Sequence, residues 1–569
     1  MLNVSLVNVH LDFGPSVIGT AEIVPRDSPQ PSPPPVDLTI PWQDPHQKAS
    51  PFALLSWHAR LSRFSGRASE VKRLEEWATS EQAVSVKFIT GEGGIGKSRL
   101  AAEFATSLAA RGWAAGFVDL REPFAFRLKQ EGTLLIVDYP EENLQGIGDL
   151  LRDLAGLGRD ARLRVLFLTR KAIDDWHEVI NDANAAVLVD PAPLVVPPLR
   201  GAGAYALFCT AQESAAELMG TVPLPVPEDA LLEWLCLAPE NDRALFIVAA
   251  AVHSALHPED PVVRYSGREV IESLVERELT LLSRMAKKAG FRDRYALARL
   301  LAVASIAGSV PVSRLAALVD GGVLGPCDAR GVELTEKLQQ VGVMTATSAE
   351  APKPDIVAAA LCLSVLARKP ETAPEAVWLA LQGDIAGSLE RFARLAYDAE
   401  VVLGMRQARM SAWLASAVMG RVDRCAALSN FFSAHYLPLS WIEAAVATWR
   451  TLLASASGDY ERAGILNNLS NYLSEAGDRA GALVGIRASV EIYRRLAGAN
   501  PARYEPDLAR SLGLQGTILV SLGRGNLAAA AFREGVDLVR PLPLAGPNDP
   551  LSALLVSLEA GLQDATRRL

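Results

Sequence analysis

The residues best suited to chemistry are the eight from Gly91 to Ser98, which read GEGGIGKS. They match the pattern G-x-x-x-x-G-K-[ST], in which glycines let backbone N–H groups converge on phosphate oxygens. The strand-like run VSVKFIT precedes them, and a helix-compatible run comes after them, so a helix N-terminus would add positive potential at a bound phosphate. We expect Lys97 to reach the β- and γ-phosphates of a nucleotide and Ser98 to ligate Mg²⁺. The alternative is a Gly-rich turn without a ligand.

A carboxylate ends a second buried strand-like run, Thr133-Leu-Leu-Ile-Val-Asp138. Because it lies roughly 40 residues after Lys97, we predict that Asp138 is a second partner of the metal ion, often through water. In the Tyr-Pro-Glu-Glu sequence directly after it, we choose Glu141 as the carboxylate that orients an attacking water. Two solvated loop acids are an equally good interpretation of this pair.

A third apolar run, LFLTR, ends at Arg170. Placed beside a γ-phosphate, Arg170 would distinguish ATP from ADP through a charge-assisted contact. The alternative is an arginine that caps the edge of a sheet. Trp57 and His58 precede these motifs and are candidates to support the same pocket, although packing is the simpler interpretation.

Strand-like runs alternate with helix-compatible segments around the three motifs, which predicts a buried parallel sheet with helices on both faces. We therefore place an α/β domain at residues 52–200. A largely helical region at 201–370 contains a helix–turn–helix pattern (residues 293–320) and a short strand-like run, VGVMTATS, that would form a wing. Residues 371–569 are predicted to be all-α. Residues 1–51 comprise a short strand-like segment and a Pro-rich linker.

The C-terminal part contains an internal repeat. Residues 466–495 align with residues 512–541 at a constant offset of 46, and each unit reads as a helix, a Gly-containing turn and a helix. Such units bury their apolar faces by stacking, so they predict a helical solenoid. A partial third unit lies at residues 549–562.

The composition restricts the function further. The chain has 569 residues, a net charge of −9 and no long Lys/Arg run, which argues against nucleic acid as the main partner. Its five cysteines form no C-x-x-C pair, so neither a disulfide framework nor a zinc site is indicated. His253 and His257 share a helical spacing but lack an evident third ligand. The longest apolar run is too short to span a bilayer, and no signal peptide is evident. We expect a cytoplasmic protein.

Residues 52–370 resemble the STAND class of AAA+-related signalling ATPases, which includes NB-ARC and NACHT proteins. Phe64-Ser-Gly66-Arg67-Ala-Ser-Glu70 is similar to a segment that lies near the adenine in that class. The runs GEGGIGKS, LLIVDYPE and LFLTR are similar to its Walker A, Walker B and sensor-1 segments. Tyr139 stands where many members have a second acid, which implies slow hydrolysis. The resemblance implies nucleotide contacts at Gly66, Arg67, Gly91, Glu92, Gly93, Gly94, Ile95, Gly96, Lys97, Ser98 and Arg99.

Two segments depart from the class. The lid of many members carries a Gly-x-Pro-Leu sequence whose proline contacts the base, whereas this chain has Asn241-Asp-Arg-Ala-Leu245. That contact is therefore not assigned. Pro354-Asp355 lies near where members place a His-Asp pair, but the match is too short to assign a role. The C-terminal repeats resemble tetratricopeptide units with a longer period.

The resemblance implies a molecular switch. In this class ADP holds a closed monomer, a trigger on the repeats opens it, ATP replaces ADP, and the open form assembles. It implies ATP/ADP and Mg²⁺ as cofactors, slow ATP hydrolysis, a ligand or protein partner on the repeats and a conditional homo-oligomer, in prokaryotic defence or signalling. For the output three alternatives stay open: a partner recruited by the N-terminal segment, an effector on a separate polypeptide, or a chain that is a fragment. Two alternatives remain: an ATP-regulated transcription factor that reads DNA through the helix–turn–helix, and a scaffold whose nucleotide only stabilises the fold.

Overall fold

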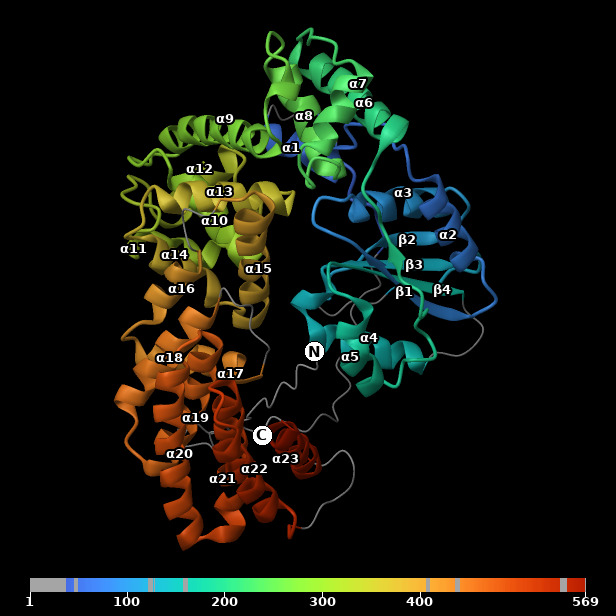
Figure 1. Cartoon of the computed structure of the whole chain (residues 1–569). Helices are drawn as coiled ribbons and strands as arrows, with labels where there is room; N and C mark the ends of the chain where they lie inside the picture. Colours follow the sequence, from blue (N-terminus) through green and yellow to red (C-terminus); the bar gives the residue numbers. More distant parts are fainter. Residues whose placement is uncertain are drawn as a thin grey trace, which may run out of the picture. The chain divides into compact units, whose positions relative to one another are not determined.

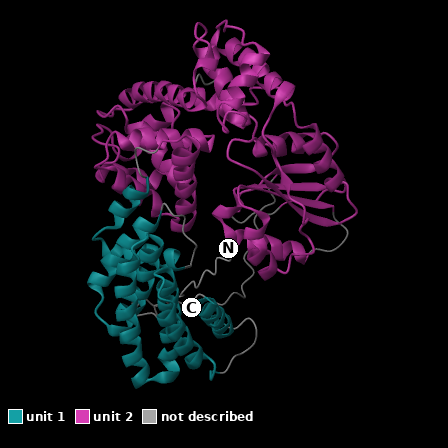
Figure 2. Ribbon diagram, in the orientation of Figure 1, with its two compact units in different colours: residues 1–23, 409–569 teal, residues 24–408 magenta. Residues whose placement is uncertain are grey.

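Two compact units divide the chain in the computed structural model: residues 24–408, and residues 409–569 together with 1–23 (Figure 2). The structure describes residues 37–43, 45, 50–120, 126, 128–156, 162–405, 410–434, 441–542 and 550–567. The strand-like segment expected before residue 25 and most of the Pro-rich linker lie outside these described residues.

A five-stranded sheet with the order β2-β3-β4-β1-β5 forms the centre of the larger unit (Figure 1). All four strand pairs are parallel. Every residue of the two long strands β1 and β4 is buried, as the continuous apolar runs predict for a doubly covered sheet. The strands are β1 (Val84–Thr90), β2 (Ala114–Phe117), β3 (Thr133–Asp138), β4 (Leu163–Thr169) and β5 (Leu194–Val195).

The register of the strands places their functional ends together. Thr90 of β1 is paired with Thr169 of β4, and Asp138 of β3 is paired with Leu168. The carboxyl ends of parallel strands meet at one edge of a sheet, which is where ligands bind in folds of this kind. The loop after β1, Asp138 and Arg170 therefore share that edge.

Helices cover both faces of this sheet. On one face Leu74, Leu100 and Phe104 belong to a core with Ile89 and Ile136. On the other face helices and strands share a second core. The first face is covered by α2 (Ala68–Ala78) and α3 (Lys97–Ala109), and the second by α4 (Leu144–Ala155) and α5 (His177–Asp182).

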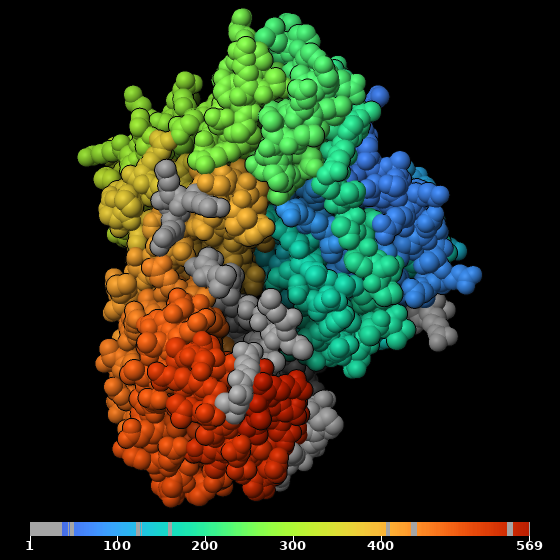
Figure 3. All heavy atoms as spheres, in the orientation of Figure 1, coloured from blue at the N-terminus to red at the C-terminus, as the bar shows by residue number. Residues whose placement is uncertain are grey.

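Helices C-terminal to the sheet complete the larger unit, together with a short N-terminal helix. Figure 3 shows the blue to cyan residues of the α/β domain adjoining the green residues of the first of these helices. The helices nearest the sheet edge are α1 (Pro51–Leu55), η2 (Trp57–Ala59), α6 (Gly201–Met219), α7 (Glu228–Cys236), α8 (Ala244–Leu256) and α9 (Gly267–Lys288). The remaining ones are α10 (Ala296–Ala307), α11 (Leu315–Asp320), α12 (Gly331–Gln340), α13 (Asp355–Ala367), α14 (Ala373–Leu381), α15 (Ile385–Tyr397) and the π-helical turn η7 (Asp398–Val402).

The winged part differs in detail from the expectation. The helix–turn–helix pattern forms α10 and α11, with strand β6 (Ser309–Pro311) between them. Its antiparallel partner β7 spans Ser348–Glu350, whereas we expected a strand at 341–348. The reason is local: Gly342 has φ of 74°, and the Val343 N–H bonds to the Leu338 carbonyl, so these residues end α12.

The smaller unit is helical throughout its described residues after 409. Each helix from α18 to α23 packs against the next in the chain. Both repeats contain a turn glycine in the left-handed region, Gly477 with φ of 88° and Gly523 with φ of 69°, where the first helix ends. Its helices are α16 (Met410–Val418), α17 (Val422–Ala434), α18 (Ile442–Ser455), α19 (Asp459–Glu475), α20 (Arg479–Ala499), α21 (Pro501–Ser521), α22 (Gly525–Val539) and α23 (Pro550–Arg567).

Within the described part of the chain, none of the helices combines the length and apolar character that crossing a membrane requires.

The aromatic core behind the sheet gives a stability prediction. Phe167 is fully buried, and its ring lies 5.2 Å from that of Phe88, which lies 5.4 Å from that of Trp176. Phe167→Ala should lower the free energy of unfolding of the larger unit by about 3–5 kcal/mol, because it leaves a cavity. Denaturant unfolding measures this, with Val187→Ala as the control, since Val187 is 85% exposed. Equal midpoints for the two variants would contradict the assigned core.

Candidate functional site

The loop between β1 and α3 wraps around the side chain of Lys97. Gly94 and Gly96 have φ of 77° and 100°, a conformation that favours glycine, and they let the loop turn directly into the helix. The Lys97 ammonium donates to the carbonyl oxygens of Gly91 at 2.6 Å and Glu92 at 3.1 Å. Burial and the nearby Arg170 guanidinium lower the pKa of Lys97 to about 8. A phosphate anion would offset both unfavourable contributions.

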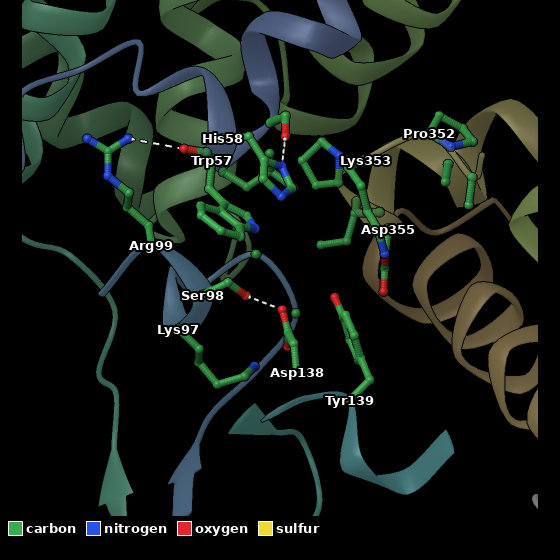
Figure 4. Close-up of a pocket in the computed structure, with 18 of the residues that line it drawn as sticks. Trp57, His58, Lys97, Ser98, Arg99, Asp138, Tyr139, Pro352, Lys353 and Asp355 are labelled. Carbon is green, nitrogen blue, oxygen red and sulfur yellow. Dashed lines mark hydrogen bonds and ion pairs between the residues drawn. The ribbon is translucent and has the colours of Figure 1, made fainter. Parts of the chain in front are cut away.

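Ser98, in the first turn of α3, and Asp138, the last residue of β3, lie side by side. The Ser98 hydroxyl donates to a carboxylate oxygen of Asp138 at 2.8 Å (Figure 4). Burial raises the pKa of Asp138 to about 6. These two hard oxygen ligands fit Mg²⁺, which usually takes one or two protein groups and completes its shell with phosphate oxygens and water. The described residues hold no cluster of three or more His, Cys, Asp or Glu side chains that suits a metal ion.

A cavity of about 530 Å³ opens in front of this pair, a volume within the usual range for a small-molecule site. Its walls come from the loop after β1, the ends of β2, β3 and β4, the segment before α2, the helices α6 and α8, and the residues directly after β7. Figure 4 shows Trp57 and His58 on one side of Ser98 and Asp138, with Lys353 and Asp355 approaching from another. The cavity lining includes Gly93, Gly94, Gly96, Lys97, Ser98, Arg99, Asp138 and Arg170 of the predicted site.

Arg170 connects the loop to the turn after α15. Its guanidinium forms a two-pronged ion pair with Asp398, with distances of 2.6 and 2.9 Å, and Asp398 is fully buried. The same guanidinium lies against Gly93, where an added Cβ would come within 2.6 Å of it. Arg170 thus contacts both the loop after β1 and η7. Its predicted role as a γ-phosphate sensor stays a prediction.

A second charged cluster surrounds Tyr139. Glu142 pairs with Arg391 at 2.8 Å and with Arg394 at 2.6 Å. Arg394 also lies 2.9 Å from Asp355 and stacks over the ring of Tyr139 at 4.1 Å. Burial alone would raise the pKa of Asp355, but Lys353, Arg394 and Arg170 hold it well below its usual range. The charges of the turn after β3, of α13 and of α15 are therefore mutually compensated.

Gly66 and Arg67, in the segment that resembles the STAND class, support the loop after β1. Arg67 is buried and donates to the carbonyl oxygens of Ile95 at 3.0 Å and Pro197 at 2.6 Å. Gly66, the residue before it, has no space for a side chain, because an added Cβ would lie 2.9 Å from Leu199. These contacts fix the loop against the end of the sheet.

Three further predicted residues, Glu92, Arg99 and Glu141, form contacts with other parts of the larger unit. Glu92 forms a 2.6 Å ion pair with Arg243, which precedes α8. Arg99 donates to the carbonyl of Ser62 at 2.9 Å and lies over the ring of Trp42 at 5.3 Å. Glu141 is buried, hydrogen-bonds with Thr169 and is absent from the cavity lining, whereas Glu142 is present there. The role of Glu141 in orienting water stays a prediction.

The lid segment that lacks Gly and Pro still contacts the loop. The Leu245 N–H donates to the Gly94 carbonyl at 2.9 Å, and the Arg243 guanidinium to the Gly93 carbonyl at 3.3 Å. Part of this contact is made by backbone groups. Because every residue type carries these groups, no sequence motif indicates the contact.

Several cavity residues escaped the sequence interpretation. Lys353 and Asp355 come after a strand of three residues, too short to be recognised by its pattern. Arg391 and Arg394 line the cavity from α15, and Asp398 of η7 pairs with Arg170. All three lie more than 200 residues after the loop that follows β1. The sequence singles out only Asp355 among them, through the similarity of Pro354-Asp355 to a His-Asp pair, and that match is too short to assign a role.

Comparison with known proteins adds one structural similarity. No family model matches the chain, and no curated protein matches it. Among solved structures, it is similar to a Signal Transduction ATPase with Numerous Domains (STAND) protein with a tetratricopeptide repeat sensor from Pyrococcus horikoshii. The identity is 13%, the match covers 89% of this chain and 82% of that chain, and the TM-score is 0.24. A TM-score this low carries no inference about activity, so the function must be inferred from the site itself.

The ion pair of Arg170 gives a second prediction. Asp398→Ala leaves a buried guanidinium without its partner, so it should lower the free energy of unfolding of the larger unit by about 3–5 kcal/mol. Glu390→Ala is the matched control, because Glu390 lies on α15 and forms a 3.8 Å pair with Lys171, beside Arg170, at partly exposed positions. It should cost at most about 0.5 kcal/mol. Denaturant unfolding compares them, and similar costs would contradict the importance of the buried pair.

Proposed function

We propose that this chain is a nucleotide-dependent switch that binds ATP and ADP with Mg²⁺ in the cavity at the carboxyl edge of the sheet. The observation that carries the proposal is the Ser98–Asp138 contact at 2.8 Å beside the Lys97 loop, facing a cavity of about 530 Å³. The loop supplies converging N–H groups and a helix N-terminus, and Lys97 supplies a positive charge. Bound Mg²⁺ would neutralise charge on the phosphates.

The residues of the site have separable tasks in this proposal. Lys97 leaves the carbonyl oxygens of Gly91 and Glu92 to contact the β- and γ-phosphates. Ser98 and Asp138 hold the metal ion. Arg67 and the lid contact at Gly94 keep the loop in shape, as their hydrogen bonds indicate. The γ-phosphate is the part of ATP that ADP lacks, so the switch requires a group that responds to it.

Arg170 is that group in our proposal. It touches Gly93 of the loop and is bound to Asp398 of η7. A γ-phosphate near the loop competes with the Asp398 carboxylate for the same guanidinium, whereas ADP leaves the pair intact. A ligand shifts a conformational equilibrium only by its differential affinity for the two states, and this competition supplies such a difference.

Slow hydrolysis is expected from the carboxylates near β3. Glu141 is absent from the cavity lining, and Glu142 is engaged by two arginines. Tyr139 stands where a second acid would otherwise come after Asp138. Because neither Glu141 nor Glu142 is placed to orient water, the chain holds ATP long enough to signal, and hydrolysis resets it.

The helical unit after residue 409 is proposed to sense a ligand or protein partner, and the ATP-bound form to assemble with further copies and act through a separate effector. The DNA-reading alternative lacks a supporting observation. Helix α11 contains no lysine or arginine, and Arg292 and Arg299 are paired with Asp328 and Asp293. The scaffold alternative differs in requiring no response to the γ-phosphate.

Nucleotide retention tests the proposal. We expect the purified protein to release ADP on heating, as identified by chromatography, and the Lys97→Ala variant to carry none. Losing two charge-assisted hydrogen bonds to phosphate should weaken ATP binding about 100-fold. Lys72→Ala is the control, because Lys72 is an exposed helix residue. If the wild type bound neither ATP nor ADP in titrations, the proposed function would be wrong.

A further inference from the structure

The short segment Ser50–Ala59 lines the cavity and is anchored to the helices α8 and α9. Helix α1 packs against α8 and α9. At its start, the carboxylate of Glu278 on α9 accepts a hydrogen bond from the Ser50 hydroxyl at 2.6 Å and another from the Phe52 N–H. Glu278 is buried, with 5% of its surface exposed. A buried carboxylate that accepts two hydrogen bonds from one segment is a strong local constraint.

The other end of this segment lies beside the phosphate-binding loop. Leu54 and Leu55 line the cavity, and so do Trp57 and His58 of η2 (Figure 4). The Trp57 ring stacks on His58 at 3.9 Å and on Phe117, at the end of β2, at 5.0 Å. The indole is therefore a support, held between the sheet and the histidine.

The surroundings of His58 fix the orientation of its ring and favour its uncharged form. Its Nδ1 lies 2.7 Å from the Ser56 hydroxyl, which fixes the ring orientation. Burial and the nearby Lys353 lower its pKa to about 4, so the ring is neutral at physiological pH. Its second nitrogen is then available to hydrogen-bond a ligand in the cavity, where Ser98 and Asp138 lie close by.

We propose that His58 contacts the phosphate chain of the bound nucleotide and that Glu278 is a positioning residue that holds His58 there. This inference rests on the proposed function and adds to it a route from the nucleotide to α9. Helix α1 has only five residues, too few for a helix to be stable without tertiary contacts. The contact with α9 is therefore one of the constraints on the position of His58, together with the packing of α1 on α8 and of Trp57 on Phe117.

The same helix also reaches the turn that holds Arg170. Arg268, in the first turn of α9, donates to the carbonyl of Gly404 at 3.1 Å, just after η7. Nucleotide contact at His58 and the position of α9 are consequently linked. A ligand that displaces α9 would change the affinity for nucleotide by the same factor by which nucleotide changes the affinity for that ligand.

Release of a fluorescent ADP analogue from the full-length protein, measured by stopped flow, tests the inference. Glu278→Ala should release it about tenfold faster, because Ser50 and Phe52 lose their common acceptor. Glu278→Gln should stay within about twofold of the wild type, since the amide oxygen can still accept from the Ser50 hydroxyl. Glu276→Ala is the matched control: Glu276 lies on the same helix and pairs with Arg368 at an exposed position.

A double-mutant cycle separates positioning from general destabilisation. His58→Ala should itself release the analogue about tenfold faster, and adding Glu278→Ala should then change the rate by less than about twofold, because both act through one contact. The inference would be overturned if Glu278→Ala released the analogue at the wild-type rate, or if Glu276→Ala accelerated release as much as Glu278→Ala. It would also be overturned if the effects of His58→Ala and Glu278→Ala on the release rate multiplied in the double variant. Failure of the wild type to bind the analogue would overturn the proposed function as well, so the two failures are distinguishable.

Discussion

The larger unit depends on one constraint: the buried guanidinium of Arg170 requires an opposite charge as its partner. Desolvation of a charge costs several kcal/mol unless an opposite charge and hydrogen bonds compensate it. Asp398 provides both, and in doing so it holds η7 against the carboxyl edge of the sheet. The neighbouring Glu142 cluster repeats the arrangement with Arg391 and Arg394. The charges that join the sheet to α15 thus lie directly beside the loop whose proposed ligand is itself highly charged.

The surroundings of the loop explain how a change at the phosphates could reach distant helices. Arg67, at the start of α2, holds Ile95, and the first turn of α8 contacts Gly94 through the Leu245 backbone. Arg170 lies on Gly93. Three different elements therefore touch successive residues of a single loop. Interfaces of this kind have discrete packed arrangements, so a small displacement of the loop favours one arrangement over another.

Local patterns predicted part of this structure and long-range packing decided the rest. The strand before Gly91, the loop, and Asp138 at the end of β3 could be predicted because each depends on neighbouring residues: continuous apolar runs, glycine spacing and a helix start. The parallel sheet could be predicted from the same runs. Lys353, Arg391 and Asp398 could not be predicted, because their approach to the site depends on how α13 and α15 pack, and no spacing in the sequence records it. The wing strand was misplaced by several residues, since the residues chosen for it end α12.

Hydrogen–deuterium exchange tests whether the γ-phosphate weakens the Arg170–Asp398 pair. Backbone exchange should be compared between protein saturated with ADP and Mg²⁺ and protein saturated with a non-hydrolysable ATP analogue and Mg²⁺. We expect faster exchange with the ATP analogue in peptides that cover α15 and η7, and little difference in peptides of β1 and β4, whose residues are buried in the sheet. Equal exchange in α15 and η7 with the two nucleotides would contradict a switch that acts through this ion pair.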